Sequence, residues 1–294
     1  MPTPVPPLPA IRLMQLEALY AGAVAAKRWK TLAGCAILVG AIVTSAVFGE
    51  VDLVKFFTHI GKFTSYIGRI FLLDSGAVVI TDPKEWFWGL AKWLRLIWET
   101  ILIAYLGTLF GGIGAFVLSF LAAENLVSTG WLRFAVRRYL EFCRTVPEIV
   151  FAMIFVVAFS LGPLPGVLAL SIHTTGALGK LFFEVIENAD LKPMDGMIST
   201  GANWVTAVRF AILPQVMSNF VSYALLRFEI NVREGALMGL VGAGGIGQDL
   251  VEAIRKFYYS DVSAILVLLI ITVSLIDYGT EKVRSRLISM EAGH

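Results

Sequence analysis

Apolar residues along the chain gather into long runs, and the segments between these runs hold most of the charged residues. The first run reads "TLAGCAILVGAIVTSAVFG", residues 31–49. It is long enough to cross the hydrocarbon core of a bilayer, which takes about 20 residues in a helix. The pattern predicts an all-α polytopic membrane protein with about six transmembrane helices, the other five at about 97–121, 147–161, 164–188, 212–230 and 262–280.

The third run is short for a membrane span. We expect this span to begin earlier, within "RFAVRRYLEFCRTV", with Pro147 as a local kink. The "GPLPG" at 162–166 predicts a tight turn before the fourth span. Glycines along the second and fourth spans predict close helix packing, because a residue without a side chain lets two backbones approach. These are Gly107, Gly111, Gly114, Gly176 and Gly179.

Residues 50–96 separate the first two spans and include "LVKFFTHIGKFTSYIGRIF", in which apolar residues recur at the helical period. Tryptophan rings suit the headgroup zone of a bilayer, and this part of the chain is rich in them. We therefore expect an interfacial segment on the extracytoplasmic surface; a seventh span hidden within it is the alternative. The tryptophans are Trp86, Trp88, Trp93 and Trp98.

Composition supports a membrane protein, because 57% of the residues are hydrophobic, 16% are charged and the mean hydropathy is +0.77. A net charge of +2 is too small to indicate nucleic-acid binding. Lysines and arginines cluster before the first span, between the second and third, and after the last, which predicts cytoplasmic termini in a bacterial inner membrane. The expected segments are 1–30 (cytoplasmic), 31–49 (first transmembrane helix), 50–96 (extracytoplasmic), 97–281 (transmembrane core) and 282–294 (cytoplasmic tail).

The stretch "VGAGGIGQDL", residues 241–250, has the glycine spacing of a dinucleotide site. Such a site also needs a preceding strand, and the chain contains no Walker-type G-x-x-x-x-G-K-[ST]. We expect a flexible re-entrant loop at the outer mouth of the bundle, whose backbone amides could help present a positive surface to an anion. Cys35 and Cys143 are expected to be packing residues. No catalytic residue, metal site or cofactor is therefore expected in this chain.

The loop "DGMISTGANWVTAVRFAILP", residues 195–214, places Gly201 between two short helical patterns, and Pro214 is suited to begin the next helix. Such an elbow is a suitable shape for docking into a groove of another protein, although an ordinary connecting loop is the alternative. The loop resembles the coupling loop of ABC-importer permeases, E-A-A-x3-G-x9-I-x-L-P, except that D-G-M replaces E-A-A and Ala211 replaces Ile. The coupling candidates are Asp195, Gly196, Met197, Gly201, Ala202, Leu213 and Pro214.

Two longer segments, residues 143–188 and 222–250, closely resemble the permease subunit of phosphonate importers, and the resemblance covers roughly 99–286. It implies a type I ABC importer permease core that works as a homodimer, with a heterodimer left open. The implied partners are a cytoplasmic ATPase dimer, which binds ATP and Mg²⁺, and an extracytoplasmic binding protein. The implied substrate is phosphonate or, in some relatives, phosphite or phosphate.

Ionisable groups inside a membrane usually face the bundle interior or an aqueous path. Lys180 and Glu184 have the spacing of a local ion pair, and His173 is either a packing residue or a gate residue. Arg227, Glu229, Arg233 and Glu234 are either structural pairs or an arginine-lined path for a dianion, since guanidinium matches the oxygens of a phosphonate. The candidates for the path and its gate are Arg144, Glu148, His173, Lys180, Arg227, Glu229, Arg233, Gly242, Gly244, Gly245 and Gly247.

Three other functions compete with this interpretation. A permease for another small solute would have the same fold. A proton-coupled secondary transporter is motivated by the ionisable residues in the spans, but the sequence lacks a clear pair of inverted repeats. A membrane-embedded enzyme would need a motif such as H-E-x-x-H or G-x-S-x-G, and neither occurs in the sequence.

Overall fold

A computed structural model describes residues 10–73 and 75–291, so the ends of the predicted segments 1–30 and 282–294 lie outside the described residues. The described residues contain no strand, only an isolated bridge between Leu72 and Val78. The all-α prediction is thereby confirmed. The helices are α1 (Ala10–Phe48), α2 (Leu53–Ile70), α3 (Pro83–Trp86), α4 (Leu90–Ala122), α5 (Gly130–Thr145), α6 (Glu148–Phe159), α7 (Pro163–Glu187), α8 (Lys192–Ser199), α9 (Trp204–Ala207), η1 (Val208–Ile212), α10 (Leu213–Met238), η2 (Gly239–Val241), α11 (Ile246–Lys256) and α12 (Tyr259–Glu291).

The chain divides into two compact units, residues 1–65 and 66–294. The first unit contains α1, which begins well before the span expected at residue 31. Its apolar stretch, Leu19–Phe48, has no buried residue within the structure. A bare apolar helix of this length is typical of a segment that contacts lipid or another protein.

Four helical stretches in the described part of the chain are long and apolar enough to cross a membrane: Leu19–Phe48, Leu90–Ala122, Pro163–Glu187 and Tyr259–Arg286. Two bent pairs bring the number to six if each pair counts as one span. They are Gly130–Thr145 with Glu148–Phe159, and Trp204–Val241 with Ile246–Lys256. Counted with both pairs, the candidate spans of the described residues number six, as predicted, and none of them begins within residues 50–89.

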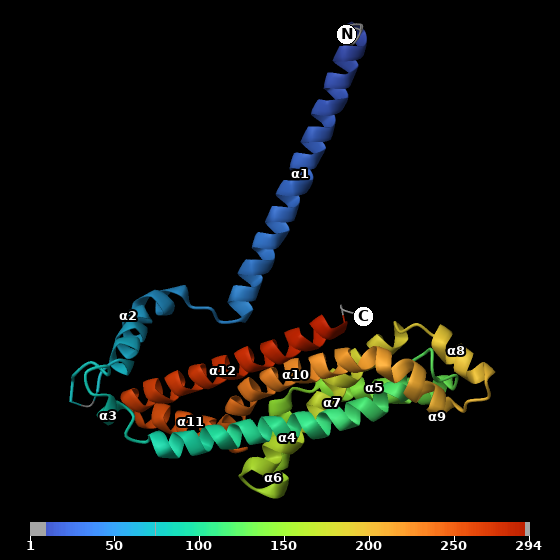
Figure 1. Cartoon of the computed structure of the whole chain (residues 1–294). Helices are drawn as coiled ribbons and strands as arrows, with labels where there is room; N and C mark the ends of the chain where they lie inside the picture. Colours follow the sequence, from blue (N-terminus) through green and yellow to red (C-terminus); the bar gives the residue numbers. More distant parts are fainter. Residues whose placement is uncertain (1–9, 74, 292–294) are drawn as a thin grey trace, which may run out of the picture. The chain divides into compact units, whose positions relative to one another are not determined.

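The expected local kink at Pro147 is wrong, because α5 and α6 meet at 86°. Proline disfavours the helical conformation in the residue before it and offers no backbone N–H of its own. Both residues of the junction are extended: Val146 has φ −76° and ψ 123°, and Pro147 has φ −56° and ψ 139°. The chain therefore turns sharply and begins a new helix at Glu148. In Figure 1, α6 leaves the direction of its neighbours.

The second unit is a bundle in which α4, α10 and α12 run alongside one another and α7 packs against α4 and α5 (Figure 1). The predicted close approaches are confirmed. A Cβ atom on Gly111 would lie 2.6 Å from Cβ of Thr174, and one on Gly107 would lie 2.7 Å from Cβ of Leu170. On the opposite side of α7, a Cβ atom on Gly176 would lie 2.5 Å from the backbone nitrogen of Arg144.

The four tryptophans before α4 and in the first turns of α4 differ in their exposure. Trp88 and Trp98 are exposed, as expected for rings in a headgroup zone. Trp93, by contrast, is only 2% exposed and belongs to the core, where it packs with residues of α4, α11 and α12. The indole N–H of Trp86 donates to Oγ of Ser263 at 2.9 Å. The indole N–H of Trp88 also donates to Oδ1 of Asp261, at 2.8 Å, so three of the four rings tie this segment to α12.

The glycine contacts predict a sharp contrast between two neighbouring positions. Gly111→Ala places a methyl group against Thr174 and should destabilise the protein by about 1–3 kcal/mol, the usual cost of overpacking. Gly112→Ala meets only Leu178, at 3.9 Å, and should be neutral or slightly stabilising. Thermal unfolding of the purified protein in detergent measures both. Equal melting temperatures for the two variants would show that this contact does not limit packing.

Candidate functional site

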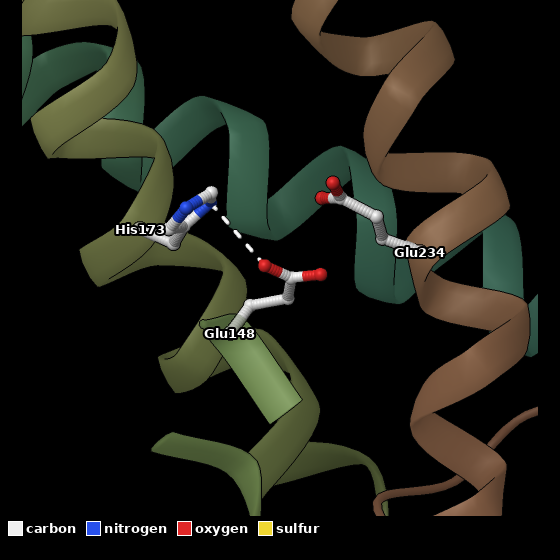
Figure 2. Close-up of side chains that lie close together, drawn as sticks. All are labelled: Glu148, His173 and Glu234. Carbon is white, nitrogen blue, oxygen red and sulfur yellow. Dashed lines mark ion pairs between the residues drawn. The ribbon is translucent and has the colours of Figure 1, made fainter. Parts of the chain in front are cut away.

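Four ionisable side chains from three helices meet inside the bundle. Glu148 is supplied by α6, His173 by α7, and Arg227 and Glu234 by α10. Figure 2 shows Glu148, His173 and Glu234 pointing toward one another. The four side chains are between 11% and 21% exposed, so the group is largely but not completely removed from solvent. We call these residues the charged cluster.

Local structure explains how the members of the charged cluster reach one another. The sharp turn at Pro147 makes Glu148 the first residue of α6, and the partial positive charge of a helix N-terminus favours a carboxylate there. Arg227 and Glu234 are seven residues apart, which is about two helical turns, so they share one face of α10. The contact at Gly176 brings the end of α5 next to His173.

The hydrogen bonds of the cluster define the state of its histidine. Nε2 of His173 lies 3.2 Å from the carbonyl oxygen of Arg144. Because a carbonyl only accepts, Nε2 carries the hydrogen and donates it. The guanidinium of Arg227 then donates from Nη2 to Nδ1 of His173, at 2.7 Å, and also to Oε2 of Glu234, at 2.8 Å. In this arrangement the histidine is neutral.

The cluster contains two carboxyl groups and one guanidinium. Arg227 is its one cation, and it is paired with Glu234. Glu148 lies 3.7 Å from Nδ1 of the neutral His173, so the cluster carries one more carboxylate than it has cations. The Nε atom of Arg227 is buried and has no hydrogen-bond partner among the described residues. A buried donor without a partner is costly, so an acceptor that bonds to it would stabilise the cluster.

Arg233 and Glu229, which we expected near Arg227, face a different neighbour. Arg233 pairs with Asp277 of α12 at 2.9 Å, and both side chains are close to half exposed. Glu229 is buried and contacts the hydroxyl of Thr280, also on α12. Arg233 therefore lies outside the charged cluster, since the helical period turns it away, and its role in the path stays a prediction.

Two other candidates also lie apart from the cluster's side chains. Lys180 and Glu184 form the expected local ion pair, with Nζ 3.4 Å from Oε1. Arg144 contributes its backbone carbonyl to His173, whereas the residue itself is exposed. Glu234 is not among the residues that the sequence indicated for the path and its gate. Its alternation in sign with Arg227 was the available signal, because residues seven apart share a helix face.

The glycine-rich loop differs from the flexible loop that the sequence suggested. Gly242, Gly244 and Gly245 have φ near +80°, as only glycine readily adopts, but the loop is buried. The N–H of Gly245 donates to Oε1 of Glu99 at 3.1 Å, and the N–H of Ile246 donates to Oγ1 of Thr100 at 3.0 Å. These amides are already bonded, so the expected positive surface for an anion is not formed by them.

Packing holds the same loop from both sides. A Cβ atom on Gly247 would lie 1.9 Å from the carbonyl oxygen of Ala236, so no larger residue fits there. The carbonyl of Gly242 accepts from the N–H of Gly162, which joins the loop to the turn before α7. Glu99 and Thr100, which bind the loop, carried no signal in the sequence because they belong to an ordinary apolar helix.

The predicted elbow at residues 195–214 consists of two short helices, α8 and α9, with Gly201 between them at φ +91°. Asn203 caps α9 by accepting from the N–H of Thr206 at 2.9 Å. Gly201 is exposed, and a Cβ atom there would meet nothing within 4 Å. Pro214 lies in the first turn of α10, where a proline costs little. The elbow is formed as predicted, and its docking role stays a prediction.

An apolar groove of about 710 Å³ is separate from the charged cluster, none of whose residues line it. Its walls come from α4, α7, α10 and α12 and are almost entirely hydrocarbon. An anion there would lose its hydration without gaining donors, so the charged cluster is the better candidate for contact with an anion. The lining residues are Tyr105, Thr108, Leu109, Gly112, Ile113, Phe116, Phe182, Met217, Phe220, Val221, Ala224, Leu225, Phe228 and Thr280.

Comparison with known proteins gives consistent results. Residues 115–279 match the family described as binding-protein-dependent transport system inner membrane component. The chain is 35% identical to the phosphite transport system permease protein PtxC of Stutzerimonas stutzeri over 79% of its own length and 83% of that protein. It is 38% identical to the phosphate-import permease protein PhnE of Mycolicibacterium smegmatis over 60% of its own length and 33% of that longer protein.

Two solved structures share the fold. The MetNI methionine ABC transporter, in an inward facing conformation, has a TM-score of 0.58 at 21% identity and covers 66% of this chain and 95% of its own. A bacterial ABC transporter that imports alginate has a TM-score of 0.58 at 13% identity and covers 88% of this chain and 99% of its own. At these identities the likeness concerns the fold alone.

The bonds to the glycine-rich loop give a testable expectation. Thr100→Val keeps the side-chain shape but leaves the buried N–H of Ile246 without its acceptor, which should cost about 1–3 kcal/mol of stability. Thr272→Val is the matched control, because that hydroxyl bonds only to the carbonyl of Leu268 in its own helix. Thermal unfolding in detergent compares the two. If the control loses as much stability as Thr100→Val, the loop contact has no special role.

Proposed function

The chain belongs to the family of binding-protein-dependent transport system inner membrane components, and from this premise we propose that the anion it carries is a phosphonate, phosphite or phosphate. The chain has the fold of an ABC importer permease and spans the inner membrane several times. The observation that carries the substrate assignment is the similarity, over most of both chains, to a phosphite transport permease.

In this proposal Arg227 is the cation that the anion meets inside the bundle. The charged cluster has no other cation, and Arg227 keeps one N–H without a protein partner. A guanidinium offers two parallel donors to two oxygens of one tetrahedral oxyanion. The candidate residues around it are Arg144 through its carbonyl, Glu148, His173 and Glu234.

The proposed partners follow from the family. A cytoplasmic ATPase dimer binds ATP and Mg²⁺, since the sequence contains no Walker motif, and this chain holds no cofactor. An extracytoplasmic binding protein delivers the anion, and a second copy of this chain completes the path. The elbow around Gly201 docks on the ATPase, which places both termini in the cytoplasm together with the basic clusters at the span ends.

Two alternatives make different predictions. A permease of this fold for another solute is compatible with the solved structures, which come from methionine and alginate transporters. A proton-coupled transporter would draw on the carboxylates and the histidine of the charged cluster. Uptake into proteoliposomes that contain the permease, the ATPase and the binding protein decides between them. Uptake of phosphonate or phosphate that requires ATP supports the proposal, whereas uptake driven by a pH gradient alone contradicts it.

The two arginines of α10 should respond differently to the same substitution. Arg227→Lys keeps the charge but loses the two-donor fork, so uptake should fall about tenfold, the effect of losing one hydrogen bond to a charged group. Arg233→Lys changes the half-exposed pair with Asp277 and should leave uptake near that of the wild type. Uptake of radiolabelled phosphate at low concentration, with complex assembly checked by size-exclusion chromatography, measures both. Equal uptake by the two variants would remove Arg227 from the path.

The elbow can be tested with a matched glycine. Gly201→Trp and Gly76→Trp both place a bulky residue at positive φ in open space, +91° and +81°, and each should cost about 1–2 kcal/mol in backbone strain. Only Gly201→Trp should uncouple ATP hydrolysis from transport or weaken binding of the ATPase to the permease. ATPase activity and uptake are measured on the same vesicles. Normal coupled transport by Gly201→Trp would contradict the docking role.

A further inference from the structure

The anionic partner of Arg227 in this structure is part of the same helix. Oε2 of Glu234 accepts from Nη2 of Arg227 at 2.8 Å, and both side chains are less than one-fifth exposed. A carboxylate presents oxygens to a guanidinium much as a phosphonate does. We propose that Glu234 is a built-in competitor, which occupies Arg227 in the empty transporter and is displaced when the oxyanion binds. This inference rests on the proposed function.

One donor of the guanidinium is not used by the protein. Nη2 of Arg227 serves Glu234 and His173, whereas Nε is buried and has no partner among the described residues. Arginine has five N–H donors in a fixed plane, so an oxyanion can accept from Nε together with a neighbouring N–H of the same guanidinium. An oxyanion that takes the place of the carboxylate therefore also gains a bond from Nε, once the side chains that cover this buried atom move aside.

The two carboxyl groups of the cluster would weaken anion binding at Arg227. Arg227 alone would bind a dianion too tightly for a transporter, which must release its substrate in every cycle. Glu234 competes directly for the guanidinium, and Glu148 repels an anion from the neighbouring helix α6 without bonding to Arg227. The two carboxylates thus weaken anion binding in different ways, so they can be separated by substitution.

Two other observations bear on the occupant of the cluster. Glu148, His173 and Glu234 each offer one ligand atom, and these atoms lie within 4.8 Å of one another, a spacing that a divalent metal also accepts. However, Nη2 of Arg227 lies within hydrogen-bond distance of two of these three residues, so the guanidinium already provides the cation. This favours an exchange of anions at Arg227, and metal binding becomes an outcome of the test.

The experiment uses the full permease in complex with its ATPase, in nanodiscs without the binding protein. Equilibrium binding of radiolabelled inorganic phosphate and of methylphosphonate is measured for the wild type and for Glu234→Gln, Glu148→Gln, Arg227→Gln and Asp277→Asn. Asp277→Asn is the matched control, because it releases Arg233 of the same helix from a carboxylate outside the cluster. Glu234→Asp is a second variant that keeps the charge and shortens the side chain by one methylene.

We expect Glu234→Gln to bind either anion about tenfold more tightly than the wild type, since it removes both the competitor and one like charge. Uptake in the complete system should at the same time slow, because release becomes limiting. Glu234→Asp should show a smaller gain, Asp277→Asn none, and Arg227→Gln should lose binding. The double variant of Arg227→Gln with Glu234→Gln should bind the anions no more tightly than Arg227→Gln alone. This result would distinguish displacement from Arg227 from a general effect of removing one negative charge.

Three results would overturn the inference. The first is unchanged or weaker anion binding by Glu234→Gln and Glu234→Asp at wild-type thermal stability, which leaves Glu234 as a structural partner while the proposed function stands. The second is that the wild-type complex binds Mn²⁺ and that Glu148→Gln and Glu234→Gln lose this binding while their anion affinity stays unchanged. The cluster would then be a metal site. The third is a wild-type complex that imports neither phosphate nor methylphosphonate, which rejects the proposed function itself.

Discussion

Helix α7 lies close to the backbones of both α4 and α5, and the charged cluster depends on these contacts. Gly107 and Gly111 of α4 receive the side chains of Leu170 and Thr174, while Gly176 of α7 lies against the end of α5. Because the last contact places the carbonyl of Arg144 beside His173, it also selects which ring nitrogen carries the hydrogen. Small residues on both sides of one helix thus determine the hydrogen-bonding state of a histidine.

Two helix breaks, one at Pro147 and one after α10, also shape the bundle. The turn of 86° at Pro147 begins a new helix, so Glu148 lies at a helix N-terminus within the bundle. The bend after α10 leads into the glycine-rich loop, whose amides are bonded by Glu99 and Thr100. Backbone groups in an apolar environment need partners, so each break occurs where protein supplies them.

The two arginines of α10 differ in their exposure and in their partners. Arg227 is 11% exposed and shares its donors with Glu234 and His173, whereas Arg233 is 49% exposed and pairs with Asp277. A buried ion pair holds its partners more strongly than an exposed one, because water screens the exposed charges. The buried guanidinium is accordingly the one whose occupancy matters for an anion in the bundle.

The sequence alone determined the all-α class, the number of spans and the elbow at Gly201, because hydrocarbon thickness, the backbone of proline and glycine, and positions along one helix are local constraints. It also indicated which spans pack closely, through glycines at fixed spacing. It did not determine that Pro147 separates two helices at 86°, that the loop at residues 242–247 is buried, or which arginine joins the cluster. Arg227 and His173 are 54 residues apart. Their contact follows from how α7 and α10 pack against α4, and only the tertiary structure decides that.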